Sequence, residues 1–167
     1  MIRVLYFFIL ALFLTSCTIR FDRVPKNTLT EFPKEMQGKY LFTSRQHTDS
    51  TYFTITSHSI KLSEKNIMEG GPLSDSLKLA KEGSFYFFCQ KGIEKHKIVW
   101  DVYPVKFSGN KLFLYALTED RHKKAYKKYF KKVEGFDNLY EMNEAKLAKF
   151  CKRKLKQKDA LKLIRVE

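Results

Sequence analysis

The sequence predicts a mainly β protein of the α+β class, built on an antiparallel sheet or a partly open β-barrel of about six to eight strands. One or two basic amphipathic helices are expected near its C-terminus. Two observations lead to this prediction. Between about residues 36 and 118, short runs of aromatic and β-branched residues alternate with turn residues. From Glu119 onward, apolar residues recur instead at helical spacing, with lysines between them.

Length and composition are those of one folded domain. The chain has 167 residues, and 32 Lys and Arg against 18 Asp and Glu give it a formal net charge of +14. Fifteen Phe and nine Tyr supply core material, and the chain has too few Gly and Pro for a collagen-like, low-complexity or wholly disordered protein. Such a charge also suits a nucleic-acid-binding protein, so the cellular compartment must be considered first.

The N-terminus has the features of an export signal. Arg3 is followed by an unbroken apolar run over residues 4–14 and by small residues that lead to Cys17. A transmembrane helix needs about 20 apolar residues, so this run is too short for an ordinary span and fits a signal peptide. Residues 1–16 are therefore predicted to be cleaved off.

The sequence Leu14-Thr15-Ser16-Cys17 resembles the lipobox of bacterial lipoproteins, in which an aliphatic residue and two small residues precede a lipidated cysteine. The resemblance implies that Cys17 is acylated and becomes the mature N-terminus. About two acyl chains are needed for stable anchoring, because each buried methylene contributes ~0.8 kcal/mol. The implied location is the bacterial cell envelope, with the outer membrane favoured over the inner. The alternative is an ordinary secretory signal, with Cys17 free or disulfide-bonded.

The mature chain is predicted to begin with a tether. Residues 17–35 contain Pro25 and Pro33 and show no sustained period, so they are expected to hold the lipidated Cys17 and a linker. Residues 36–167 are expected to form a single β-rich domain with C-terminal helices.

Three β-hairpins are expected in this domain. The third is the clearest, because Gly109 between two long apolar strands supplies the left-handed backbone that a tight turn needs. Pro104 in the first of these strands indicates an edge or a bulge. Neither face of this hairpin is polar, so a second layer must cover it. The expected strands are 38–43 and the pairs 51–56 with 59–63, 77–81 with 85–90, and 98–107 with 111–118.

Two helices follow the strands. The first is expected to begin at Glu119, with Thr118 as its cap, and to end at Gly135. The second spans 144–156, with Asn143 as its cap, and residues 161–166 form either a short closing strand or the tail of that helix. The apolar stripe of the second helix consists of Leu147, Phe150, Cys151 and Leu155.

The basic helices are the strongest candidate site after Cys17. Residues 121–158 contain 14 Lys and Arg against 4 Asp and Glu, a net charge of +10, whereas residues 18–120 carry only +3. The simpler interpretation is a solvated helix face. The functional interpretation is contact with an anionic surface, such as anionic lipid, lipopolysaccharide or an acidic envelope protein. The predicted contact residues are Lys123, Lys124, Lys127, Lys128, Lys131 and Lys132.

Other candidate residues give weaker signals. Cys89 and Cys151 both point toward the core, and the choice between a disulfide and two buried thiols is open. Asp101 lies in an apolar strand and is expected to mark an outward position, a bulge or an ion pair with a lysine; the alternative is a ligand cavity. No metal site is expected, because the four histidines are scattered at positions 47, 58, 96 and 122.

A second resemblance concerns the fold. The strand entry Gln37-Gly38-Lys39-Tyr40 and the succession of short hairpins over residues 36–118 are similar to small bacterial lipoproteins with lipocalin-like β folds. The similarity implies a partly open lipocalin-like barrel whose aromatic interior could hold an apolar ligand. It ends near residue 118, because helices follow where a lipocalin would add strands.

The sequence therefore favours a non-enzymatic, membrane-anchored envelope lipoprotein of binding or structural type. No cofactor is expected, and export argues against a nucleic-acid partner. The alternative is an envelope hydrolase or transferase without a recognisable active-site motif, since the chain has no nucleophile elbow, phosphate-binding glycine loop or dinucleotide fingerprint.

Overall fold

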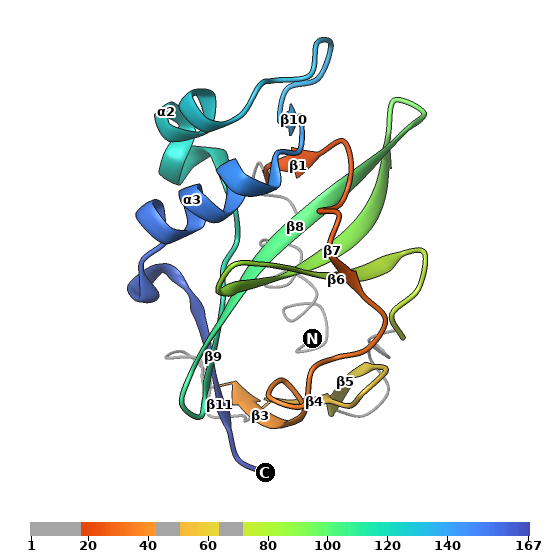
Figure 1. Ribbon diagram of the computed structural model, residues 1–167, viewed down its shortest axis with the longest axis vertical. Coiled ribbons are helices and arrows are strands. Elements are labelled where there is room, and N and C mark those ends of the chain that lie inside the picture. Colours follow the sequence, from red (N-terminus) through yellow and green to blue (C-terminus); the bar gives the residue numbers. More distant parts are fainter. Residues whose placement is uncertain (1–17, 43–50, 64–71) are drawn as a thin grey trace, which may run out of the picture.

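A computed structural model describes residues 18–42, 51–63 and 72–167 of the chain, and it is mainly β (Figure 1). Two α-helices, α2 (Glu119–Tyr129) and α3 (Glu144–Lys154), and a 3-10 turn at Gln157–Asp159 accompany the sheet. The strands are β1 (Arg20–Phe21), β2 (Thr28–Leu29), β3 (Gly38–Phe42), β4 (Thr51–Ile55), β5 (Ile60–Ser63), β6 (Leu77–Glu82), β7 (Phe85–Glu94), β8 (Lys97–Ser108), β9 (Lys111–Leu114), β10 (Leu139–Tyr140) and β11 (Leu161–Arg165).

The sheet curls into an open half-barrel (Figure 1). Its strand order is β2-β6-β7-β8-β9-β11-β3-β4-β5, and each pair along this path is antiparallel. β1 pairs with β8 and, in parallel, with β10. The mainly β class and the antiparallel sheet are confirmed, but eleven strands in the described residues exceed the predicted six to eight. Three of them have only two residues, which is too short to show a period in the sequence.

The three predicted hairpins are present, and β11 is the closing strand that was one of two alternatives for residues 161–166. A fourth hairpin joins β7 to β8 through Lys95 and His96, whose φ angles are 48° and 62°. The sequence does not predict this turn, because such left-handed positions are usually taken by Asn or Gly. The register pairs nearest the predicted turns are Ile55 with Ile60, Glu82 with Phe85, and Ser108 with Lys111.

Pro104 does not lie in an edge strand, contrary to one of the two predictions for it. Its carbonyl accepts a hydrogen bond from the Tyr115 amide at 2.9 Å, so the missing N–H also faces the β9 side. β9 ends at Leu114, one residue before Tyr115. The proline therefore lies beside the end of β9. Closer to the start of β8, at Asp101, the pairing partner of β8 is β1.

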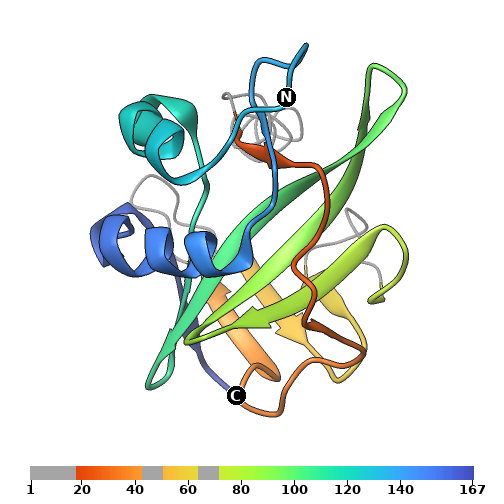
Figure 2. The same ribbon diagram turned by 45° about the horizontal axis from the view of Figure 1, so that its top comes forward.

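The sheet separates two hydrophobic clusters, one on each face. The outer cluster joins strand residues such as Phe87 to Tyr126 and Phe150 of the helices, and Figure 2 shows both helices on the outer side of the sheet. The inner cluster fills the curve of the half-barrel and includes Tyr40 and Leu112. The two helices provide the second layer that the apolar faces of β8 and β9 require.

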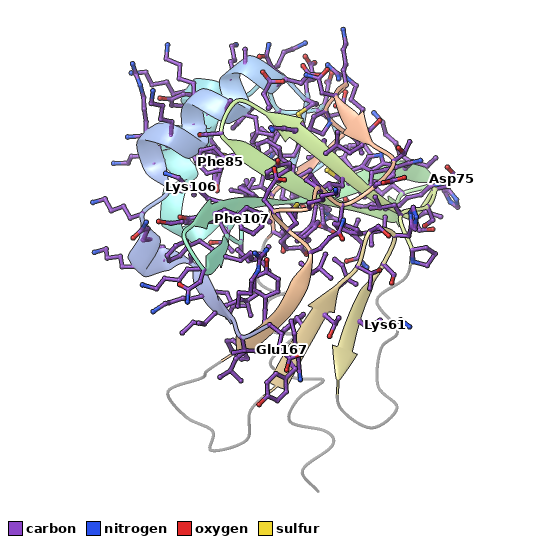
Figure 3. The ribbon with its side chains drawn as sticks, turned by 60° about the horizontal axis from the view of Figure 1, so that its bottom comes forward. Lys61, Asp75, Phe85, Lys106, Phe107 and Glu167 are labelled. Carbon is purple, nitrogen blue, oxygen red and sulfur yellow. The ribbon has the colours of Figure 1, made fainter. Side chains whose placement is uncertain are left out.

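Neighbouring residues of β8 show how the two faces alternate (Figure 3). Lys106 lies on the outer side, with its Nζ 5.9 Å from the centroid of the Phe85 ring. Phe107 points to the inner side, where its ring centroid lies 6.0 Å from that of Tyr86 in an edge-to-face contact. Aromatic side chains thus occupy both faces, which explains why neither face of this hairpin is cleanly polar in the sequence.

The predicted tether is wrong for residues 18–35, which belong to the folded domain. Ile19 and Phe21 are fully buried in the outer cluster, and Phe32 is buried in the inner one. Two-residue strands and single apolar anchors carry no periodic signal, so the sequence of this segment resembles that of a linker. Cys17 and residues 1–16 lie outside the described residues.

The two helices differ in how well their ends were predicted. α3 begins as expected, because the side chain of Asn143 accepts a hydrogen bond from the Lys146 amide at 3.0 Å, and it ends at Lys154, two residues before the predicted end. α2 ends at Tyr129 rather than at Gly135. Its C-cap is Phe130, which is extended and buried against Phe150, because the chain turns there to enter the core.

Candidate functional site

The candidate site is a basic surface formed by the two helices and the segments that follow them. We call it the basic layer, and define it as the exposed Lys and Arg side chains of residues 124–158. Long nitrogen-tipped side chains project from the helices into solvent in Figure 3. The layer contains Lys124, Lys127, Lys128, Lys131, Lys132, Lys146, Lys149, Lys152, Arg153, Lys154, Lys156 and Lys158.

The structure confirms exposure for five of the six predicted contact residues. Lys124, Lys127 and Lys128 lie exposed on α2, whereas the side chain of Lys123 is outside the described residues. Lys131 and Lys132 are also exposed, but they follow the helix instead of extending it. The predicted single six-lysine helix face is therefore wrong, and the reason is the turn of the chain into the core at Phe130.

Ion pairs neutralise little of this layer. Lys131 Nζ lies 2.7 Å from Glu141 Oε1, and this hydrogen bond raises the pKa of Lys131. Glu144, at the start of α3, pairs instead with Arg23 of the N-terminal segment, with 2.5 Å between Nη1 and Oε1. Two of the four carboxylates of residues 121–158 thus form ion pairs. Glu141 pairs with Lys131 of the layer, and Glu144 pairs with Arg23, which lies outside it. The local excess of positive charge persists in the folded protein.

The residue after the predicted lipidation site lies beside the first helix. Thr18 forms an antiparallel bridge with Thr118, the residue that precedes α2. The Ile19 amide donates to the Leu117 carbonyl at 2.7 Å, and the Asn138 side-chain amide donates to the Thr18 carbonyl at 2.7 Å. Residue 18 therefore belongs to the folded domain and lies next to the start of α2.

Both cysteines of the predicted pair are buried free thiols. Burial raises the pKa of Cys89 to about 12, and burial also raises the pKa of Cys151. Cys89 Sγ donates to the Phe87 carbonyl at 3.7 Å. The structure thus contains the buried-thiol alternative, in which each cysteine acts as a small apolar side chain of the outer cluster.

Asp101 has a charged neighbour in the sheet. It lies opposite Arg20 in the β1–β8 register, and burial raises its pKa while the Arg20 charge opposes this shift. Arg20 also lies 2.9 Å from Glu94 Oε2 and donates to Asn138 Oδ1 at 2.8 Å. Asp101 thus has an arginine rather than a lysine as its charged neighbour, and the guanidinium of that arginine forms its ion pair with Glu94.

The described residues contain no group of three His, Cys, Asp or Glu side chains placed to hold a metal ion. None of the helices in that part of the chain is long and apolar enough to cross a membrane. Comparison of the chain with protein families, curated proteins and solved structures finds no match.

Sequence reasoning missed two parts of the site. The sequence shows that α3 and the segment after it are basic, but the predicted contact residues all precede α3. The bridge between Thr18 and Thr118 gives no signal in the sequence, because it joins two single residues a hundred positions apart.

Proposed function

We propose that the protein is a membrane-anchored lipoprotein of the bacterial envelope, of non-enzymatic type, whose basic layer contacts an anionic surface. The lipobox-like sequence that ends at Cys17 supplies the anchor in this proposal. The basic layer supplies the contact. Anionic lipid headgroups are the partner that the anchor brings closest, and lipopolysaccharide or an acidic envelope protein offers the same negative charge.

The observation that carries the proposal is the position of Thr18. Consecutive Cα atoms are ~3.8 Å apart, so an acylated Cys17 would attach its lipid within one residue of the folded domain. Thr18 in turn lies beside Thr118 and hence beside the start of α2. Charges act on a membrane only within about a Debye length, ~8 Å at physiological salt. A long flexible tether would let the lysines move out of this range, whereas this short junction keeps them near the bilayer.

The positive charge of the basic layer is large enough to contribute to membrane binding. A lysine near an anionic membrane surface contributes about 1 kcal/mol. Several exposed lysines can therefore add to the anchoring energy of the acyl chains and, more importantly, orient the domain. Since this contact is electrostatic, it weakens as salt concentration rises.

An apolar ligand inside the half-barrel is a second candidate, supported by the inner cluster. Phe42, Phe53, Phe88 and Phe107 lie on or against that cluster and are only partly buried. A lipocalin-like barrel would use such a surface to hold an apolar molecule. Solvent extraction of the purified protein, followed by mass spectrometry, tests this candidate, which requires a bound lipid or other apolar molecule at stoichiometric amount.

Membrane fractionation of cells that produce the full chain tests the anchor. Globomycin, which blocks lipoprotein signal cleavage, should cause the unprocessed precursor to accumulate. Cys17→Ala should move the protein out of the acyl-labelled membrane fraction, and Cys89→Ala is the matched control that should not. Equal acyl labelling of the Cys17→Ala protein would contradict the proposal.

A further inference from the structure

The tip of the β7–β8 hairpin carries an exposed apolar pair. The side chain of Ile93 is 76% exposed and that of Ile98 is 48% exposed, and the two residues are directly opposite each other in the register of the hairpin. Cross-strand partners have their side chains on the same face, so they form one patch. Among the described residues, Val166, at 46%, is the one other large apolar side chain exposed to this degree.

Positively charged residues surround this patch. Lys91 precedes it, Lys95 lies in the turn and Lys97 follows the turn, and the side chains of Lys95 and Lys97 are exposed. Lys95 and His96 occupy the two left-handed positions of the turn, which Asn and Gly adopt at lower cost. The one nearby carboxylate of the tip, Glu94, is paired with Arg20. The tip therefore combines two isoleucines with a positive rim.

The tip is connected to the basic layer through the loop that follows α2. Lys95 Nζ donates to the Gly135 carbonyl at 2.6 Å. The ammonium groups of Lys95 and Lys97 lie 5.3 and 5.7 Å from the centroid of the Phe136 ring. Both Figure 1 and Figure 2 show α2, this loop and the hairpin tip at the same end of the molecule. The lysines at the tip thus contact the loop that leads on from the basic layer, and this loop also carries the exposed Glu134 and Asp137.

We infer that the hairpin tip inserts Ile93 and Ile98 into the headgroup region of an anionic bilayer, while the surrounding lysines contact the lipid phosphates. Apolar side chains at an interface, together with basic residues around them, are the composition of interfacial membrane-binding elements. Two side chains form a patch far smaller than the ~800 Å² per partner of a stable protein interface, which favours a bilayer over a protein as the partner. This inference rests on the proposed membrane function, and it adds the element that orients the domain.

Quenching of tryptophan fluorescence by brominated phospholipid, measured in single-tryptophan variants, tests the inference. Trp100 is the only tryptophan of the chain, so the full-length, lipidated protein carrying Trp100→Phe serves as the background. Ile93→Trp places the reporter at the tip. Ser108→Trp is the matched control, because Ser108 is an exposed residue at the opposite end of β8. Each protein is reconstituted into phosphatidylglycerol–phosphatidylethanolamine vesicles with and without brominated phospholipid.

The expected result is that tryptophan at position 93 shifts its emission to the blue and loses most of its intensity in brominated vesicles, while tryptophan at position 108 does neither. Protein that floats with the vesicles but shows no quenching at position 93 overturns the inference and leaves the anchor proposal standing. Equal quenching at both positions also overturns it. A blue shift without lipid quenching would show that the tip packs against protein instead.

Two further controls keep the outcome unambiguous. Protein that fails to float with the vesicles overturns both the anchor proposal and the inference that depends on it. If Trp100→Phe disturbs the fold, as judged by circular dichroism, a bimane label on Ile93→Cys in the otherwise unaltered chain replaces the tryptophan. Labelling of the unaltered chain then measures any background from Cys89 and Cys151, which are buried.

Discussion

Thr18 and Thr118 form an antiparallel bridge, so the residue after the predicted lipidation site and the residue before α2 are neighbours in the fold. The segment that continues from Thr18 packs in the core, and α2 carries exposed lysines. Thr18, the first residue after the predicted anchor, and the start of the helix that carries part of the basic layer therefore lie side by side in the fold. Several measurements can test the consequences.

Phe21→Ala should destabilise the protein by about 3–5 kcal/mol, because the fully buried ring contacts Phe130 at a centroid distance of 5.2 Å. A residue in a free tether would give no change. Urea unfolding followed by circular dichroism measures the difference. Phe136→Ala is the control, and it should cost much less because Phe136 is only partly buried.

Lys124→Glu combined with Lys128→Glu should weaken binding of residues 18–167, produced without the lipid, to phosphatidylglycerol vesicles. The loss of two lysines at about 1 kcal/mol each corresponds to roughly thirty-fold in affinity, and the two added negative charges increase this loss further. Co-sedimentation at low salt measures this loss. Lys34→Glu combined with Lys61→Glu makes the same charge change on exposed residues outside the basic layer. An equal loss in both double variants would show that net charge, not the layer, determines binding.

Cys89 and Cys151 should not react with maleimide at pH 8 in the folded protein. Burial raises the pKa of both thiols, so neither forms the reactive thiolate at this pH, and neither is accessible. Both should react promptly in denaturant without added reductant, as read by the mass increase for two labels. If the unfolded protein takes up no label until it is reduced, the two cysteines are joined by a disulfide.

Glu144→Gln should lower stability by up to about 1 kcal/mol at neutral pH, because Glu144 pairs with the partly exposed Arg23. The hydrogen bond from Arg23 lowers the pKa of Glu144 in the folded state. A lowered carboxyl pKa stabilises the fold above the ordinary pKa of ~4.3, and this contribution is lost as pH falls through the folded-state value. Chemical denaturation at pH 7 and pH 3 should show a difference that becomes smaller at the lower pH. A difference of equal size at both pH values would mean that Glu144 acts through packing.

The sequence was most informative where an element is long enough to show a period. The hairpins around Gly83 and Gly109 and the helix capped by Asn143 were predicted because side-chain alternation, turn glycines and a capping side chain agree there. The turn at Lys95 and His96 was missed because neither residue type signals a left-handed backbone.

The remaining differences come from contacts between distant parts of the chain. The end of α2 depends on Phe130 reaching Phe150, and the folding of residues 18–35 depends on Ile19 and Phe21 finding the outer cluster. No local pattern contains this information. The positive charge of residues 121–158 was visible in the sequence, but its position relative to Thr18 was not, and it is this position that supports the membrane proposal.

The intact mass of the mature protein, purified from bacterial membranes, tests the predicted lipid anchor. We expect a chain that begins at Cys17, with residues 1–16 removed and the mass of a diacylglyceryl group, with or without a further acyl chain, added to that residue. A mature chain that retains residues 1–16, or one that begins with an unmodified cysteine, would contradict it.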